Sequence, residues 1–414
     1  MTSTDSPDNA RTPHQIKTLA RSAKALVNNG NIADAKHIYL KILEIAPFHG
    51  AALSFFAQSA YKDGDLEKAL ALMDKAIQGS PRNPRHFQNR AEIYKAMGRP
   101  DDAIRDLDQV QLLLPDFPMP LFDKALMLKA SGKWDDAVRT AISAWQQEPG
   151  LEAVANDESL PQSVRDKIIE CANLIRSTLL IMIDAELEPI IKDHGKPPCQ
   201  RIFDAVAAFT GLDTLKDEYG ATVRSFMLAS LPAFTAEMAS GWINMLEQRY
   251  PSIQNLIGLM NIPSQAGVIG VIRHDIRTMT GNGTYQTLMP DLDVLPVIPE
   301  PDGNVNLLIA ASGSHLLNRA GDENWKLIAY LPIEIPDKAL LVLDQQETRP
   351  VSGKLIIGDA THNHYLHVGA NTTARFLCFH VWHPGLTAVE ITGIQAVFRA
   401  IRKFDTRYRQ LQAA

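Results

Sequence analysis

The sequence predicts an α+β multidomain protein with an N-terminal α-helical solenoid, a helical middle and a C-terminal jelly roll. Three observations support this prediction. Small residues and prolines recur at intervals of 34 in the first third, apolar residues keep helical spacing through the middle, and short β-rich runs follow Pro263. We therefore expect regions at 16–150, 151–262 and 263–414.

The first region is defined by its internal repeat. Glycines, two alanine series and prolines each recur four times with the period of 34. They are Gly30, Gly64, Gly98 and Gly132; Ala23, Ala57, Ala91 and Ala125; Ala35, Ala69, Ala103 and Ala137; and Pro47, Pro81, Pro115 and Pro149. Alanines let paired helices approach closely, glycine suits a turn with a left-handed backbone, and proline ends a helix.

This pattern resembles an array of four tetratricopeptide repeats. Such arrays form superhelices whose concave surface commonly binds peptide or protein segments. We therefore expect a peptide or protein partner in the groove. The alternative is that the array only packs against the rest of the chain.

The sequence of the middle region predicts helices and offers no candidate catalytic or metal-binding residues. LIRSTLLIMIDAELEPIIKDHG and ATVRSFMLASLPAFTAEMASGWINMLEQRY both carry apolar residues at helical spacing, and Pro232 interrupts the second. Phe234 and Trp242 are expected in the core.

The last region predicts strands and one final helix. VIGVIR, VNLLIAA, WKLIAYLPI, ALLVLD, KLIIG and ARFLCFHVW are separated by turn residues, which is typical of a barrel or jelly roll. LTAVEITGIQAVFRAIRKFDTRYRQL is an amphipathic helix whose apolar side would dock on the strands. Six of the 12 histidines lie between 315 and 383, and DATHNHYLHV is the densest run. Because imidazole is a common metal ligand, a metal site is one hypothesis and a structural role the other.

Composition excludes several classes of protein. The 414 residues hold 41 Lys+Arg and 47 Asp+Glu, a formal charge of −6, which argues against a general nucleic-acid binder. Three scattered cysteines predict no disulfide framework and a reducing compartment. The polar start does not resemble a signal peptide, and the most apolar run, 178–183, is shorter than the roughly 20 residues of a membrane span. We expect a cytoplasmic protein.

The strand region resembles the aspartyl/asparaginyl β-hydroxylases, a family of iron(II)/2-oxoglutarate oxygenases. The matching stretches are GSHLLNRAG, ENWKLIAYLPIEIP, GKLIIGDATHNHYLHV and ARFLCFHVWHPGLTAVE. Members of this family also carry tetratricopeptide repeats before the oxygenase domain. The resemblance implies a double-stranded β-helix of the jelly-roll or cupin type. It also implies a dioxygenase that uses Fe(II) and 2-oxoglutarate to hydroxylate a peptide side chain or small molecule.

The resemblance also assigns site residues. His364 matches the second metal histidine and Gly321 matches the glycine that this family has where other oxygenases have a carboxylate. Arg319 stands where the first metal histidine belongs, and arginine offers a metal no lone pair. Ile328 and Tyr330 replace an arginine and a histidine that hold substrate or cosubstrate. Arg375 is the candidate for the 2-oxoglutarate arginine, although it lies 11 residues after His364, one more than the family spacing.

Three hypotheses follow from these residues. The first is an oxygenase with altered ligation, in which His315, His362 or Asp322 joins His364 at the metal; His362 would share a strand face with His364. The second is a degenerate oxygenase fold that acts as a binding or scaffold protein through its tetratricopeptide repeats, with Arg319 forming an ion pair where iron would otherwise lie. The third is a scaffold whose repeats are its whole function. On sequence alone we favour the first, with His364 and His315 as metal ligands.

Overall fold

The computed structural model divides the chain into two compact units. Unit 1 comprises residues 1–181 and 403–414, and unit 2 comprises residues 182–402. The structure describes residues 8–147, 157–210, 215–216, 222–223, 226, 228, 231–232, 234–259, 271–275, 298, 305–318, 323–343 and 345–409. The division falls inside helix α10 (Gln162–His194) and helix α15 (Ala388–Tyr408), so the helical middle is shared between the units.

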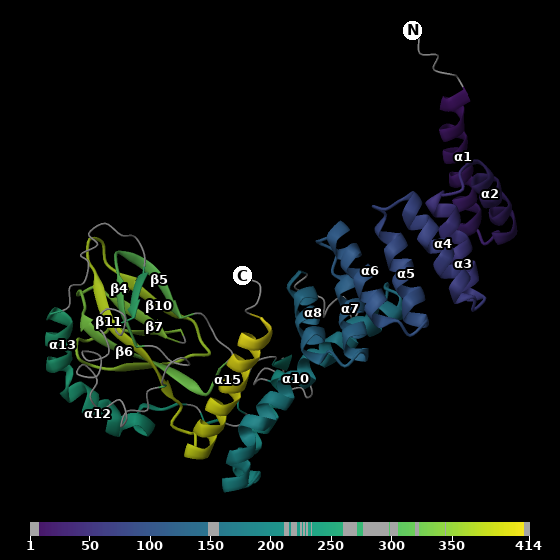
Figure 1. Ribbon diagram of the computed structural model, residues 1–414. Helices are drawn as coiled ribbons and strands as arrows, with labels where there is room; N and C mark the ends of the chain where they lie inside the picture. The colour runs from purple at the N-terminus through teal and green to yellow at the C-terminus, as the bar shows by residue number, and fades with distance from the viewer. Residues whose placement is uncertain are drawn as a thin grey trace. The chain divides into compact units, whose positions relative to one another are not determined.

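Unit 1 contains the predicted helical repeats, which follow one another in Figure 1. Each repeat is a pair of helices. The pairs are α1 (Asp8–Asn28) with α2 (Ile32–Ile45), α3 (Gly50–Lys62) with α4 (Leu66–Gly79), α5 (Pro84–Ala96) with α6 (Pro100–Leu113), and α7 (Met119–Ala130) with α8 (Trp134–Gln147).

The repeated small residues have the roles that their chemistry predicts. The glycine between the helices of each pair has a positive φ, from 69° at Gly98 to 82° at Gly64. Both alanine series are buried, with at most 4% of any of these residues exposed. Close helix packing and a left-handed turn therefore explain the period. The first half of α10 closes the array, because Ile168 and Cys171 pack against Phe122 of α7.

Unit 2 is built on two antiparallel sheets. One has the strand order β5-β10-β7-β8 and the other β3-β4-β11-β6-β9. The strands are β3 (Val271–Asp275), β4 (Val305–Ala310), β5 (Gly313–Asn318), β6 (Lys326–Glu334), β7 (Leu340–Leu343), β8 (Gln346–Thr348), β9 (Ile356–Asp359), β10 (His364–Val368) and β11 (Ala374–Trp382). These two antiparallel sheets agree with the predicted C-terminal jelly roll.

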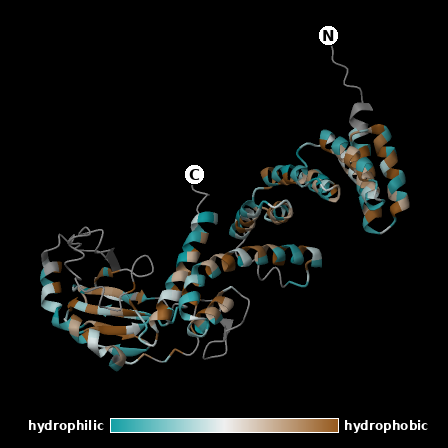
Figure 2. Ribbon diagram, turned by 60° about the horizontal axis from the view of Figure 1, so that its bottom comes forward, coloured by the Kyte–Doolittle hydropathy of each residue, from teal (hydrophilic) through white to brown (hydrophobic). Residues whose placement is uncertain are grey.

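The five-stranded sheet is buried on both faces. Leu308, Phe376 and Leu366 belong to the core between the sheets. On the outer face, Leu377 packs with Ile253 and other residues of α12 (Ser240–Gln248) and α13 (Tyr250–Leu259), which lie beside the strands in Figure 1. Burial on both faces explains why β6 and β11 are nearly continuous apolar runs. Figure 2 shows brown, hydrophobic stretches among the strands of this unit.

The predicted helix over 221–250 begins later than expected. Residues 222–223 form strand β2 (Thr222–Val223), which pairs with β1 (Leu215–Lys216). A 3-10 turn, η2 (Ala236–Ala239), then leads into α12 at Ser240. Pro232 prevents a helix through this segment, and β-branched residues favour the strand. Phe234 and Trp242 pack against the outer core, as predicted.

Helix α15 is held to unit 2 by apolar and ionic contacts. Its Ile394 and Val397 are fully buried, as the amphipathic pattern predicts. At its start, Thr387 and Glu390 form a reciprocal capping box. Arg201 of α11 (Gln200–Phe209) binds both oxygens of Glu390 at 2.6 and 2.7 Å. Burial raises the pKa of Glu390, but the hydrogen bonds from Arg201 and Thr387 outweigh it and leave the pKa below its ordinary value.

Candidate functional site

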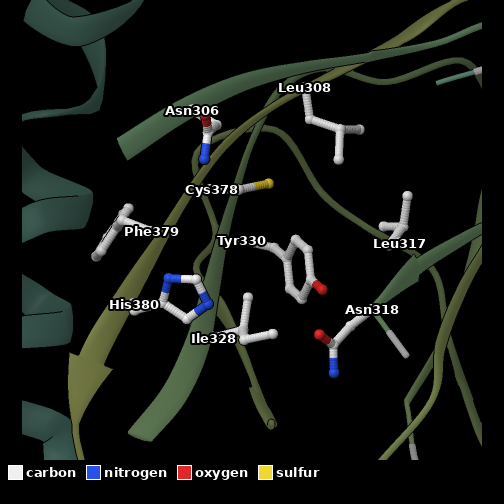
Figure 3. Close-up of a pocket in the computed structure, with 9 residues that line it drawn as sticks. All are labelled: Asn306, Leu308, Leu317, Asn318, Ile328, Tyr330, Cys378, Phe379 and His380. Carbon is white, nitrogen blue, oxygen red and sulfur yellow. The ribbon is translucent and has the colours of Figure 1, made fainter. Parts of the chain in front are cut away.

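A pocket opens on the inner side of unit 2, between the two sheets. Its empty volume, counted together with the part open to solvent, is about 390 Å³. In Figure 3 the Tyr330 hydroxyl and the Asn318 side chain point toward the same space. The lining residues come from β4, β5, β6 and β11: Asn306, Leu308, Leu317, Asn318, Ile328, Tyr330, Cys378, Phe379 and His380.

Tyr330 of the pocket wall forms a buried hydrogen-bonded pair with His364. Their relative exposures are 2% and 0%, respectively. The Nε2–H of His364 donates to the Asp359 carbonyl oxygen at 2.8 Å, because a carbonyl can only accept. Nδ1 therefore carries the lone pair and accepts the Tyr330 hydroxyl proton, also at 2.8 Å. Both ring nitrogens of His364 thus have partners inside the fold.

Gly358 provides the space for this histidine. A Cβ at position 358 would lie 2.5 Å from Cε1 and 2.8 Å from Nε2 of His364. These distances are far below van der Waals contact. Any side chain at position 358 would therefore displace the His364 ring from its present position. The glycine of the GDATHNH stretch is therefore a packing requirement.

The other predicted histidines lie elsewhere. The Nε2–H of His315 donates to the Ala311 carbonyl at 2.6 Å, so its ring is turned toward the start of β5. His364 faces Asn318 at the opposite end of that strand. His362 does not share a strand face with His364 as expected, because it lies in the turn before β10. Asn318 holds this turn by donating to the His362 carbonyl at 2.8 Å.

Several predicted positions lie outside the described residues. These are Arg319, Gly321 and Asp322. Their part in the site stays a prediction. Tyr330, which the resemblance placed at the site, does lie beside His364.

Arg375 lies on the other face of its sheet. It pairs with Ile309 in β4, and Ile309 packs against the outer core. Its guanidinium binds Glu334 at 2.6 Å, and 37% of its side chain is exposed. The structure therefore does not bring Arg375 to the pocket. The residue at the family spacing of ten is Ala374, which is fully buried between the sheets.

No metal-binding group is evident among the residues that the structure describes. They include no cluster of three or more His, Cys, Asp or Glu side chains that could hold an ion. His383, in the VWHP stretch, accepts a hydrogen bond from the Gly385 amide at 3.0 Å. Burial lowers its pKa, so it serves the fold as a neutral ring.

Several residues of the site were not predicted from the sequence. No site role was predicted for Asn318, Gly358 or the Asp359 carbonyl. His380 is one of the six histidines between 315 and 383, but it was not assigned to the site either. Strand alternation could have placed His380 with Cys378 on the inner face, because they are two residues apart. The Asp359 contact depends on the turn conformation and leaves no signal in a sequence pattern.

The comparisons with protein families agree with both parts of this architecture. Tetratricopeptide repeat models match residues 21–84 and 60–119. The model of the aspartyl/asparaginyl β-hydroxylases matches residues 290–384. The chain combines tetratricopeptide repeats with a β-hydroxylase-like domain. This confirms the resemblance seen in the sequence, and the repeats support a protein-binding role.

Solved structures resemble the repeat region. MamA is 20% identical, with a TM-score of 0.31, over 35% of this chain and 83% of that one. YrrB, described as a TPR protein with an unusual peptide-binding site, is 17% identical, with a TM-score of 0.30, over 38% and 84%. The Yersinia enterocolitica type III secretion chaperone SycD, in complex with a peptide of the translocator YopD, is 19% identical, with a TM-score of 0.24, over 29% and 88%. No curated protein matches the chain.

Within the parts of the chain that the structure describes, every helix is too short or too polar to cross a bilayer.

Proposed function

We propose that the protein is a peptide-binding scaffold whose β-hydroxylase-like domain binds no iron. This is the second of the three hypotheses from the sequence. The observation that carries it is the hydrogen bonding of His364, whose two ring nitrogens are held by Tyr330 and by the Asp359 carbonyl.

The donor set of the described residues does not fit iron. A metal ligand must offer a nitrogen lone pair, and the lone pair of His364 is used by Tyr330. Freeing the ring would leave buried groups unsatisfied, at a cost of about 1–3 kcal/mol each. The expected second ligand, His315, is bound to Ala311 instead.

The anchoring of 2-oxoglutarate is also unsupported. A clamp for a carboxylate needs an arginine that reaches the pocket. Arg375 points to the outer face and is paired with Glu334. Ile328 and Tyr330 give the pocket an apolar wall and a hydroxyl in place of the charged residues of the family.

The second candidate function is the iron(II)/2-oxoglutarate dioxygenase that hydroxylates a peptide side chain or small molecule. The family match over residues 290–384 favours it, as does the inward orientation of His364. This function requires one ring nitrogen of His364 to exchange its present partner for the metal, while the other nitrogen can keep its hydrogen bond.

Anaerobic titration of the full chain with Fe(II), with and without 2-oxoglutarate, distinguishes these functions. Dialysis measures bound iron, and succinate release under oxygen measures turnover. We expect no saturable iron and no succinate above a protein-free control. The His364→Ala variant is the matched control and should behave like the parent chain. Saturable iron or succinate that disappears in His364→Ala would establish the dioxygenase instead.

A further inference from the structure

We infer that the peptide bound by the repeat array is acidic and lies along the first helices of the repeats. This inference rests on the proposed peptide-binding function, and it adds the chemical class of the partner. Its basis is a separation of charge between the two helices of each pair.

The first helices are basic and the second helices are acidic. Helices α1, α3, α5 and α7 together hold ten Lys or Arg and three Asp or Glu. Helices α2, α4, α6 and α8 hold six Lys or Arg and ten Asp or Glu. Since the whole chain carries a charge of −6, the positive charge of the first helices is a local feature.

The repeat period aligns much of this positive charge. Lys17, Arg21 and Lys24 are spaced i, i+4 and i+7, so they share one face of α1. Arg85 of α5 lies two periods of 34 after Lys17. Lys62 of α3 lies one period after position 28, which follows Lys24 by four residues and so shares its face. We call these five residues the basic stripe. All five are exposed.

The basic stripe lacks neutralising partners. None of its five residues forms an ion pair with any other described residue. Glu92 of α5 lies at an equivalent position, but its carboxylate is 4.0 Å from Lys95. The positive charge along the stripe is therefore available to a ligand.

Two acidic side chains of α6 are in the opposite situation. Asp106 is bound by Arg90 at 2.7 Å, and Asp101 is bound by Lys133 at 2.7 Å. Because these carboxylates are already paired, they do not cancel the field of the stripe at short range.

In the second and third repeats the first helices lie on the inner side of the stack. In a curved stack, helices on the inner side lie closer to those of the next pair than helices on the outer side do. Helix α3 contacts α5, while α4 and α6, both fully described, make no contact of comparable extent. On α1 the stripe is roughly opposite Ala23, which is buried against α2. The stripe therefore faces the groove.

An acidic peptide fits this surface better than a nucleic acid does. Amide side chains, Gln58 and Asn89, and the partly buried Phe55 lie between the cations at equivalent positions. Hydrogen-bonding amides and an apolar side chain suit an extended peptide.

Fluorescence anisotropy with the full chain tests this inference. The probes are labelled peptides of equal length built from Gly-Ser-Glu, Gly-Ser-Gln or Gly-Ser-Lys repeats, and a labelled oligothymidylate. We expect the glutamate peptide to bind most tightly and to weaken as salt is added.

Two charge-reversal variants locate the site. The triple variant Lys17→Glu/Arg21→Glu/Lys24→Glu should bind the glutamate peptide at least about tenfold more weakly, a loss of about 1.4 kcal/mol. The control, which reverses Lys36, Lys41 and Lys75 to Glu on the second helices, makes the same change in net charge and should change binding less than about twofold. Circular dichroism checks that both variants fold.

Each other outcome has a defined meaning. Equal or tighter binding of the glutamine or lysine peptide would overturn the acidic preference and leave the peptide-binding function intact. Equal losses in both variants would overturn the location. Preference for oligothymidylate would replace the peptide by a nucleic acid. Failure of every peptide to bind would refute the proposed function itself.

Discussion

Gly358 offers a direct test of the buried histidine. In Gly358→Ala the new methyl carbon would start 2.5 Å from Cε1 of His364. Because the ring is fully buried between the sheets, it must shift, and it then loses its bond to Tyr330, to the Asp359 carbonyl or to both.

The expected cost follows from two effects. Overpacking a well-packed core costs about 1–3 kcal/mol. A buried hydrogen-bonding group left unsatisfied adds about 1–3 kcal/mol. Part of the strain is relieved by the movement that breaks the bond, so we expect Gly358→Ala to lower the free energy of unfolding of unit 2 by about 2–4 kcal/mol.

Urea unfolding followed by tryptophan fluorescence measures this loss, since Trp325 and Trp382 report on unit 2. The matched control is Gly369→Ala, where the nearest atom to the added carbon is 3.4 Å away. It should leave stability unchanged or raise it by up to about 1 kcal/mol. In a His364→Ala background the ring is gone, and Gly358→Ala should then cost little. Equal costs in both backgrounds would refute the reasoning.

Three further predictions test other parts of the structure. Arg201→Met leaves the buried Glu390 carboxylate without a cationic partner, so unit 2 should lose about 3 kcal/mol of unfolding free energy in urea, and the double variant with Glu390→Gln should recover part of it. Because burial lowers the pKa of His383, its neutral form stabilises the fold. That contribution should be lost as pH falls below the ordinary value of 6.5, and His383→Gln should flatten the dependence of Tm on pH in this range. The methyl carbon added by Gly64→Ala has no atom within 4 Å, but residue 64 has φ +82°, which disfavours alanine. This variant should therefore lower the free energy of unfolding of unit 1 by about 1 kcal/mol, measured by thermal unfolding. An unchanged stability would contradict the left-handed turn.

The repeats could be predicted because their constraints are local and recur. The glycine at the left-handed turn and the alanine at the helix contact are each required by neighbouring residues within one repeat. Each of these residues recurs four times. The β region carried weaker signals. Runs such as β6 are apolar because both faces are buried, whereas the short β8 is fully exposed and shows no pattern. Strand β5 was noticed only as a stretch matching the family.

The candidate site was predictable in position but not in chemistry. Family spacing placed His364 and Tyr330, and the structure brings them together. The spacing could not show that a carbonyl from the preceding turn would take the second nitrogen of His364. That bond depends on how the turn between β9 and β10 folds, and Asp359 shapes the turn by accepting from the amide and hydroxyl of Thr361.

Arg375 shows how one residue of spacing decides which face of a strand carries a charge. Adjacent residues of a strand point to opposite sides of a sheet, so a candidate displaced by one position from the family spacing leaves the pocket. A bulge could restore it, and β11 does shift register against β6 between Arg375 and Phe376. Against β4, however, the pairing runs without a break from Ala374 to Phe379. Ala374 therefore stays inside and Arg375 stays outside, where the ion pair with Glu334 satisfies its charge. A methyl group therefore stands at the position where the family spacing expects the arginine, and the only charge of this strand segment lies on the opposite face of the sheet.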